Sequence, residues 1–365
     1  AAEVIYADLM RNPKLHEEHL RELVVMLQDV GAHAAALSLL EYSAEHSRES
    51  CDLRALGGAL NDIGCVLLNR GDLEKAMVAF EEVEMAFRDL GYPDRYAAVL
   101  RESNLLVDSS AAVQAVNDTR LLARAIANQA TVWVKRGGTD AATNRYAVAE
   151  RLSRGCQDLA GLAQTLLNLG RLAVTLGDAA LAHARFDEAE RTCRSARELE
   201  LLASVLQAKA DLLTQGGDHV AALGCQREAG HIHATIGGAQ QVAESLEAQL
   251  ALLQRLGRPE QALAVLAELQ TLSVGRDDRV LAASLLNRAI VCGNMGRHEQ
   301  ASVLAGEALA AAEHCGSGDL ASRSAEVLRT SRTLADAAVE ALWRASNGGD
   351  GVAVRRSRSK SVSRQ

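Results

Sequence analysis

Few residues in this sequence have the types and spacing needed for catalysis or metal binding. His16 and His19 lie three apart and could share a helix face as a pair of metal ligands, although exposed polar residues at a chain end explain them better. His231 and His233 lie two apart, so on a helix they point to different faces. The sequence contains no P-loop, no GxSxG, no HExxH and no GxGxxG after a strand. We therefore predict a protein that is not an enzyme, with no catalytic residue, metal site or cofactor.

Seven cysteines are spread through the chain without a CxxC pair. In a large helical protein they are best interpreted as single buried or half-buried thiols. Their odd number fits a reducing compartment, and no apolar run approaches the roughly 20 residues that span a bilayer. We therefore expect a cytoplasmic protein that does not associate with membranes.

The composition is that of a helical protein with an acidic body. Apolar residues make up 48% of the chain, aromatic residues only 3%, and there are three prolines. The segment from Ser346 onward carries a net charge of about +4, so the rest carries about −12. An acidic body argues against a broad surface for nucleic acid and leaves at most weak binding through the basic end.

Glycines recur along the chain with a period of about 40 residues, apart from one gap of 66. They stand at Gly31, Gly71, Gly137, Gly177, Gly217, Gly257 and Gly296. An alanine follows each glycine by five residues, and apolar residues precede each glycine by eleven and by five. A fixed period of this kind indicates a repeat protein.

Each repeat predicts two antiparallel helices. The apolar residues before the glycine form one face of a first helix, which the glycine ends in a left-handed conformation. Asp72, Asp178 and Asp218 can then cap the second helix, and the alanine lets the two helix backbones approach closely. One helix pair cannot bury both its faces, so stability must come from stacking on neighbouring pairs.

The units resemble tetratricopeptide repeats in a long variant of about 40 residues. Leu60, Gly64, Ala76 and Phe80 match the family pattern in one unit, and Leu166, Gly170, Ala182 and Phe186 match it in the best-preserved unit. Longer helices and missing prolines are similar to the repeats of kinesin light chains, spindle-orientation adaptors and many bacterial regulators. The resemblance implies an all-α, right-handed α-solenoid of stacked antiparallel helix pairs over residues 14–315, with seven full units.

The resemblance also implies a concave binding groove lined by the first helices. Asparagine nine residues before the glycine commonly binds the backbone of an extended peptide in that family, since an amide both donates and accepts hydrogen bonds. Arginines one turn away could add charge-assisted contacts to an acidic ligand. The candidate groove residues are Asp62, Arg124, Asn128, Asn168, Arg171 and Asn287. Ala208 and Ala248 interrupt this ladder, and the asparagines could instead merely solvate an inner surface.

The remaining segments depart from the repeat. Residues 1–13 should form a terminal helix that caps the array or finishes an upstream unit, and residues 316–345 a closing helix. The 66-residue gap predicts a truncated unit near 94–118: a helix over 94–107, a break at 108–110, a short second helix, and a new first helix near Thr119. Residues 346–365 should be a disordered basic tail with possible phosphorylation at Ser357, Ser359, Ser361 and Ser363.

Together these features predict a non-enzymatic scaffold or adaptor that binds a protein or peptide partner in its concave groove. The alternative is a ligand- or peptide-sensing regulatory domain of a larger bacterial-type signalling or transcriptional regulator. The start at Ala1 rather than Met permits an effector domain upstream.

Overall fold

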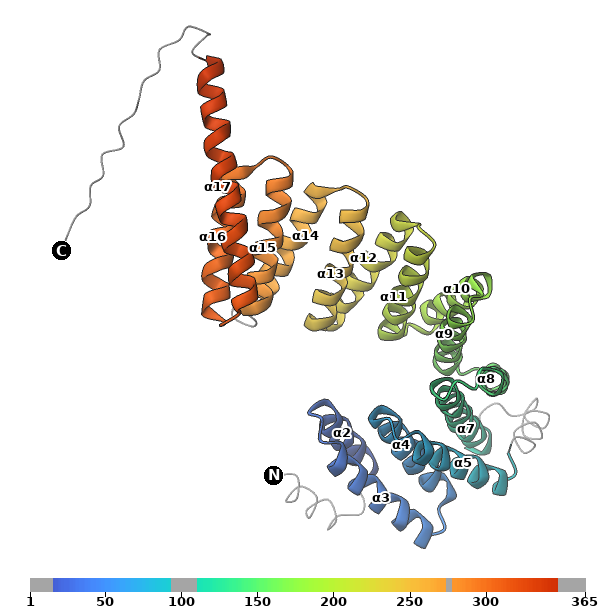
Figure 1. Cartoon of the computed structure of the whole chain (residues 1–365). Helices are drawn as coiled ribbons and strands as arrows, with labels where there is room; N and C mark the ends of the chain where they lie inside the picture. Colours follow the sequence, from blue (N-terminus) through green and yellow to red (C-terminus); the bar gives the residue numbers. More distant parts are fainter. Residues whose placement is uncertain (1–15, 93–109, 274–277, 347–365) are drawn as a thin grey trace, which may run out of the picture. The chain divides into compact units, whose positions relative to one another are not determined.

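The computed structural model describes residues 16–92, 110–273 and 278–346 (Figure 1). These residues form fifteen helices and no strand. In chain order the helices are α2 (His16–Asp29), α3 (His33–Glu49), α4 (Leu53–Arg70), α5 (Leu73–Asp89), α7 (Ser110–Lys135), α8 (Thr139–Gly155), α9 (Leu159–Thr175), α10 (Ala179–Ala196), α11 (Leu199–Gln215), α12 (His219–Ile236), α13 (Ala239–Arg255), α14 (Pro259–Ser273), α15 (Asp278–Asn294), α16 (His298–His314) and α17 (Gly318–Ser346). Consecutive helices pack in pairs, so the chain is an all-α solenoid.

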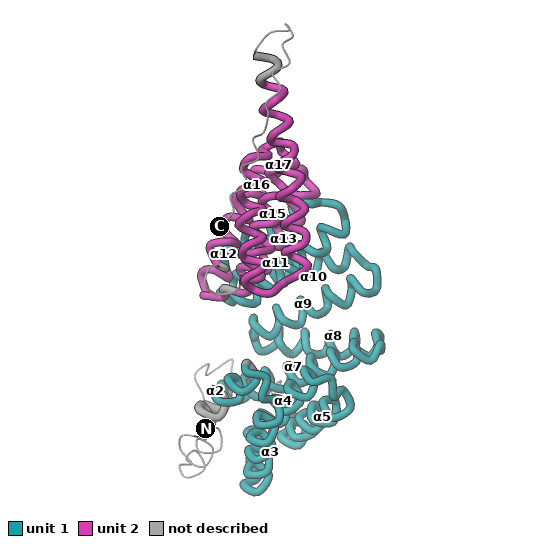
Figure 2. The backbone as a smooth tube through the Cα atoms, turned by 60° about the vertical axis from the view of Figure 1, so that its left-hand side comes forward, with its two compact units in different colours: residues 1–232 teal, residues 233–365 magenta. Residues whose placement is uncertain are grey.

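The chain divides into two compact units (Figure 2). Residues 1–232 form unit 1, which holds the helices from α2 through most of α12. Residues 233–365 form unit 2, which holds the end of α12 and the helices from α13 to α17.

The repeat glycines end the first helices, as the sequence predicted. All seven have positive φ, for example 77° at Gly177 between α9 and α10. A residue with a Cβ is disfavoured there, which explains why glycine recurs. Asp178 and Asp218 then cap the next helices by accepting hydrogen bonds from the amides of Leu181 and Ala221. Asp72 occupies the same position, but its side chain makes no capping hydrogen bond.

The repeat alanines are buried where the two helices of a unit meet. All seven, Ala36, Ala76, Ala142, Ala182, Ala222, Ala262 and Ala301, are at most 1% exposed. Leucine or isoleucine eleven residues before the glycine is also buried in every unit from α4 onward, for example Leu166 and Leu206. The predicted core of the repeats is therefore confirmed from α4 onward, whereas Met26, five residues before Gly31 on α2, is 58% exposed.

Within unit 1, ion pairs connect the second helices of neighbouring repeats. Arg48 and Glu82 join α3 to α5 at 2.7 Å, and Arg154 and Glu188 join α8 to α10 at 2.5 Å. Arg194 and Glu228 join α10 to α12 at 2.7 Å. Each pair is separated by 34 residues in the sequence, so the repeat itself encodes the contact.

Helix α7 differs from the prediction. A single helix runs from Ser110 to Lys135, where the sequence predicted a short helix followed by a new one near Thr119. The hydroxyl of Thr119 donates to the carbonyl of Ala115 inside this helix, and both residues are buried. Burial of Ala115 and Leu122 in one core explains why the helix continues. The predicted helix over 94–107 and its break at 108–109 lie outside the described residues.

At the other end, α17 is the longest helix described, with 29 residues, and packs on α15 and α16. Leu320 near its start joins a core of Ala282, Leu285, Leu286, Ala308 and Ala312. The predicted N-terminal helix over 1–13 and the basic tail from 347 onward lie outside the described residues.

Candidate functional site

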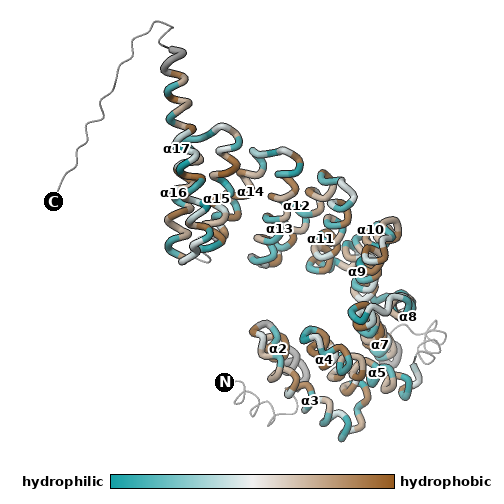
Figure 3. The backbone as a smooth tube through the Cα atoms, in the orientation of Figure 1, coloured by the Kyte–Doolittle hydropathy of each residue, from teal (hydrophilic) through white to brown (hydrophobic). Residues whose placement is uncertain are grey.

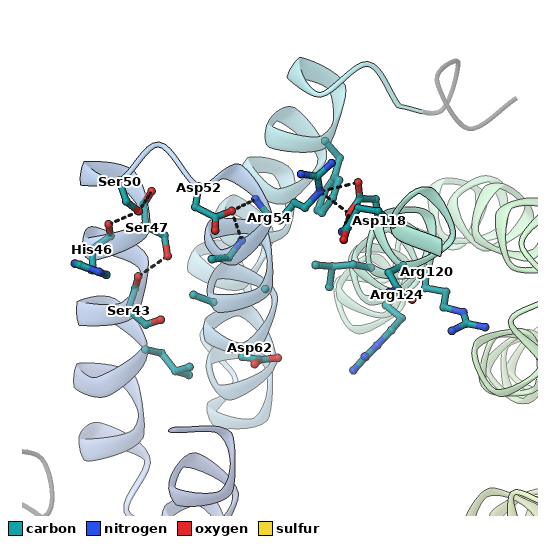
Figure 4. Close-up of a pocket in the computed structure, with 18 of the residues that line it drawn as sticks. Ser43, His46, Ser47, Ser50, Asp52, Arg54, Asp62, Asp118, Arg120 and Arg124 are labelled. Atoms are coloured by element: carbon teal, nitrogen blue, oxygen red, sulfur yellow. Dashed lines mark hydrogen bonds and ion pairs between the residues drawn. The ribbon is translucent and has the colours of Figure 1, made fainter. Parts of the chain in front are cut away.

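A groove of about 980 Å³ lies in unit 1 between α3, α4 and α7 (Figure 4). We call it the α4–α7 groove. Residues from all three helices line it: Ser43, His46, Ser47 and Ser50 from α3 and the turn after it, Asp52 just before α4, Arg54, Gly58, Ala59 and Asp62 from α4, and Gln114, Asn117, Asp118, Arg120, Leu121 and Arg124 from α7. Polar and charged side chains line the groove together with apolar ones such as Leu40, Phe87 and Leu121.

The hydroxyl groups on the α3 side are engaged in local hydrogen bonds. Ser47 donates to the carbonyl of Ser43 at 2.8 Å, and Ser50 donates to the carbonyl of His46 at 2.9 Å. These hydroxyls keep acceptor capacity for a ligand but have no further hydrogen to donate.

Arg54 and Asp118 form an ion pair across the groove. The Nε atom of Arg54 lies 3.0 and 2.9 Å from the two carboxylate oxygens of Asp118, which is only 3% exposed. Gln114 donates a further hydrogen bond to Asp118 at 2.8 Å. The hydrogen bond to Asp118 raises the pKa of Arg54 above its ordinary value. These contacts fix α4 against α7 at one side of the groove.

Arg120 and Arg124 lie on the α7 side of the same groove, apart from the Arg54–Asp118 pair (Figure 4). They are one helical turn apart, and both are exposed. Neither guanidinium forms an ion pair or hydrogen bond with any residue that the structure describes. They therefore offer free donors to a bound ligand.

Two of the predicted groove residues, Asp62 and Arg124, line the α4–α7 groove. Asn128 does not. Its amide nitrogen donates to the side-chain oxygen of Asn61 at 3.1 Å and lies 3.4 Å from the sulfur of Cys65, so it connects α7 to α4. Asn61, which is 1% exposed, in turn donates to Asp62 at 3.3 Å. Burial raises the pKa of the Cys65 thiol to about 11.

Asn168 and Arg171 lie on α9, outside the lining of the α4–α7 groove. The side-chain oxygen of Asn168 accepts a hydrogen bond from Gln164 at 3.2 Å. Arg171 is exposed and lies near Asp211, whose pKa is raised by burial and lowered in part by Arg171. Asn168 is half-buried, and neither residue lines the α4–α7 groove.

Asn287 lines a smaller cavity of about 500 Å³ in unit 2. Leu250, Leu269 and Leu320, each less than 9% exposed, form an apolar floor there. Arg279 and Arg323 lie among the other lining residues. The structure thus brings together Asp62 and Arg124 and places the other predicted residues at separate points along the solenoid.

Several groove residues were missed at the sequence level. The spacing of Arg120 and Arg124 was a usable signal, because residues four apart share a helix face. The Arg54–Asp118 pair gave no such signal, since 64 residues and the irregular gap separate its members.

The described residues contain no group of three or more His, Cys, Asp or Glu side chains that could hold a metal ion. No helix among them is long and apolar enough to cross a membrane. The four serines of the predicted phosphorylation sites lie outside the described residues.

No protein-family model and no curated protein matches the sequence. Solved structures do match the fold. BtubC (BKLC) from P. vanneervenii is 17% identical, with a TM-score of 0.51, over 65% of this chain and 89% of that chain. A tetratricopeptide repeat protein from Parabacteroides merdae ATCC 43184 is 15% identical, with a TM-score of 0.39, over 86% of this chain and 98% of that one. The chain has a tetratricopeptide-type repeat fold.

A Rap protein complexed with competence and sporulation factor is 11% identical, with a TM-score of 0.48, over 87% of this chain and 86% of that chain. At such identities the similarity concerns the tetratricopeptide-type fold alone. The fold hosts many unrelated functions, so function must be argued from the groove itself.

Proposed function

We propose that this protein is a non-enzymatic interaction scaffold that holds an acidic segment of a partner protein in the α4–α7 groove. The observation that carries the proposal is the pair of exposed arginines, Arg120 and Arg124, which line the groove and have no partner among the described residues. Two free guanidinium groups one turn apart favour carboxylates, which they can bind through two parallel hydrogen bonds.

Some other arginines of unit 1 have structural partners. Arg154 bridges Glu150 and Glu188, and Arg194 bridges Glu190 and Glu228. These side chains stabilise the stack of second helices and have acidic partners already. Arg120 and Arg124 have no such partner and both line the groove, which supports a role in binding rather than in folding.

The centre of the groove leaves room for a polypeptide. Gly58 of α4 lines it, and a Cβ built at this glycine would meet no atom within 4 Å. A partner segment can therefore approach the α4 backbone closely and bury apolar side chains against Ala59 and Leu121. Burial there would supply affinity, and the arginines would supply specificity and faster association.

Asp62 adds a negative charge to the α4 wall of the groove, opposite the arginines of α7. It lines the groove on α4, and its carboxylate would repel an acidic segment. Asp62→Asn should therefore leave binding intact or strengthen it, whereas loss of the arginine charges should weaken it.

Site-specific photocrosslinking tests the proposal. A photoreactive phenylalanine analogue replaces Gly58 in the groove or Gly224 on α12, which is a helical glycine with equally open surroundings. We expect crosslinks to a partner from position 58 and none from position 224, and the crosslinked partner peptide should be rich in Asp and Glu.

Charge reversal then separates a real site from chance contact. Arg120→Glu with Arg124→Glu should reduce crosslinking at position 58 at least about tenfold, because charge-assisted hydrogen bonds contribute more than neutral ones. Equal crosslinking from positions 58 and 224, or crosslinking unaffected by charge reversal, would overturn the proposal.

A further inference from the structure

The cavity of unit 2 that contains Asn287 combines an apolar floor with polar groups at its mouth. Leu250 from α13, Leu269 from α14 and Leu320 from α17 are each at most 8% exposed and form the floor. All the helices that line the cavity belong to residues 233–365, so it is built within one unit. Its volume of about 500 Å³ is typical of cavities that hold small molecules.

The floor favours a ligand with a sizeable apolar body. Hydrophobic and hydrophilic residues alternate along α13, α15 and α17, the helices that supply most of the lining (Figure 3). Val280 and Ala283 of α15 are half-buried and extend the floor made by the leucines. Transfer of an apolar group from water to such a surface is favourable, so the floor can supply affinity.

The side chain of Asn287 is the polar group that the α15 wall offers to a ligand. It is half-buried in the cavity, and its amide forms no hydrogen bond with any described residue. Ser284, nearly one turn earlier on α15, is already engaged, because its hydroxyl donates to the carbonyl of Leu281 at 2.9 Å. An amide without a partner favours a ligand that can donate or accept a hydrogen bond beside the apolar floor.

Charges of both signs surround the mouth of the cavity and cancel. The lining includes two arginines and two acidic residues, Arg279, Arg323, Glu247 and Asp319. Glu247 is exposed on α13 and has no ion-pair partner among the described residues. Arg323 and Asp319 lie 3.8 Å apart on α17 and are 54% and 81% exposed, so their ion pair is weak and readily replaced. A ligand with one positive and one negative group suits such a mouth better than an acidic or a basic one.

We propose that this cavity binds a free amino acid with a large apolar side chain. The side chain packs on the leucine floor, the ammonium group faces Glu247 and the carboxylate faces Arg323. Asn287 forms a hydrogen bond with the polar end of the ligand from α15. The site is independent of the α4–α7 groove, which lies in unit 1 and is proposed to hold an acidic segment. It gives the chain a small-molecule binding role beside that of a scaffold.

Equilibrium dialysis of the whole chain with radiolabelled L-phenylalanine tests the proposal. Phenylalanine should bind, and three relatives should compete at least about tenfold less well, because each lacks one group that the cavity recognises. Phenethylamine lacks the carboxylate, hydrocinnamate lacks the ammonium group, and glycine lacks the apolar side chain. The proposal fails if neither L-phenylalanine nor L-leucine binds at concentrations up to about 10 mM, or if phenethylamine and hydrocinnamate compete as well as phenylalanine.

Charge-neutralising variants locate the site. Glu247→Gln with Arg323→Gln should weaken the binding of phenylalanine at least about tenfold, because both charge-assisted contacts are lost. Glu244→Gln with Arg329→Gln is the matched control, since these exposed residues lie on the same two helices and do not line the cavity. Equal binding by the two double variants would overturn the proposal.

A blocked amino acid separates a free ligand from a residue within a peptide. N-acetyl-phenylalanine amide keeps the apolar side chain and carries neither charge, so it should compete at least about tenfold less well than phenylalanine. Equal competition would show that the cavity receives a side chain of a partner peptide, and the assignment of a free amino acid would then be wrong.

Discussion

Gly170 of α9 lies directly against the ring of Phe186 on α10. A Cβ built at Gly170 would approach the Cδ1 atom of the ring to 2.6 Å, which is closer than real side chains come. Gly64 and Phe80 form the same pair between α4 and α5, again with a spacing of 16 residues. In these two repeats the missing side chain of the glycine therefore leaves the space into which the phenylalanine ring packs.

Gly170→Ala should destabilise the protein by about 1 to 2 kcal/mol, because overpacking costs more than the helix gains from alanine. Gly224→Ala in α12 is the control, since its Cβ would meet no atom within 4 Å. That control should instead stabilise the protein by about 0.5 to 1 kcal/mol. Urea unfolding followed by circular dichroism measures both, and equal midpoints for the two variants would show that the ring does not need the glycine.

The periodic part of the fold could be predicted because the repeat fixes backbone and packing together. A glycine with positive φ and an alanine buried between two helices are required in every unit, so both recur every 40 residues or so. The continuous course of α7 could not be predicted in this way, because it lies beside the irregular gap where the period gives no register.

The candidate groove was less predictable than the fold. Periodicity identified the face on which Arg124 and Asn128 lie, but a neighbouring residue decides whether each side chain is free. Asn61, which is not at the periodic polar position, accepts a hydrogen bond from the side-chain amide of Asn128. No described residue accepts a hydrogen bond from the guanidinium of Arg124. The alternative role as a sensing domain stays a prediction.

Loss of the Arg54 side chain should destabilise unit 1, since the buried carboxylate of Asp118 would keep only Gln114 as a side-chain partner. We expect Arg54→Ala to lower the unfolding free energy by about 1 to 3 kcal/mol. Arg70→Ala is the control, because Arg70 and Asp72 are 3.7 Å apart and about equally exposed, and it should change stability by no more than about 0.5 kcal/mol. A double variant, Arg54→Ala with Asp118→Ala, should lose less than the sum of its parts, and strict additivity would argue against a direct interaction.

Two thiols, the half-buried Cys65 and the buried Cys193, should react slowly in the folded protein. Burial raises the pKa of Cys65 and of Cys193 from 9.0 to about 11, whereas Cys51 is exposed. Because the thiolate is the reactive form, an alkylating reagent at pH 8 should modify Cys51 first, Cys65 more slowly, and Cys193 only when the protein opens. Peptide mass spectrometry over time gives the order, and early labelling of Cys193 would contradict it.

The raised pKa values of Cys65 and Cys193 also predict how the stability of the protein changes at alkaline pH. A group whose pKa is raised on folding stabilises the folded protein at pH values below its pKa in the unfolded chain. That contribution is lost as the pH rises through its pKa in the folded protein. The unfolding free energy should therefore fall between about pH 9 and pH 11. Cys65→Ala with Cys193→Ala should show a shallower decline than the parent chain, and parallel curves would rule out these thiols as a cause.

Asn128 and Arg124 should separate stability from binding, although they lie one turn apart on α7. Asn128→Ala removes the hydrogen-bond partner of Asn61, which is 1% exposed, and should cost about 1 to 2 kcal/mol of unfolding free energy. Arg124→Ala removes an exposed, unpaired side chain and should change stability by less than about 0.5 kcal/mol while weakening crosslinking at position 58. Denaturant unfolding and the crosslinking assay, run on both variants, give four values. If Asn128→Ala reduced binding without reducing stability, Asn128 would be a ligand-binding residue after all, and its contacts with α4 would be secondary.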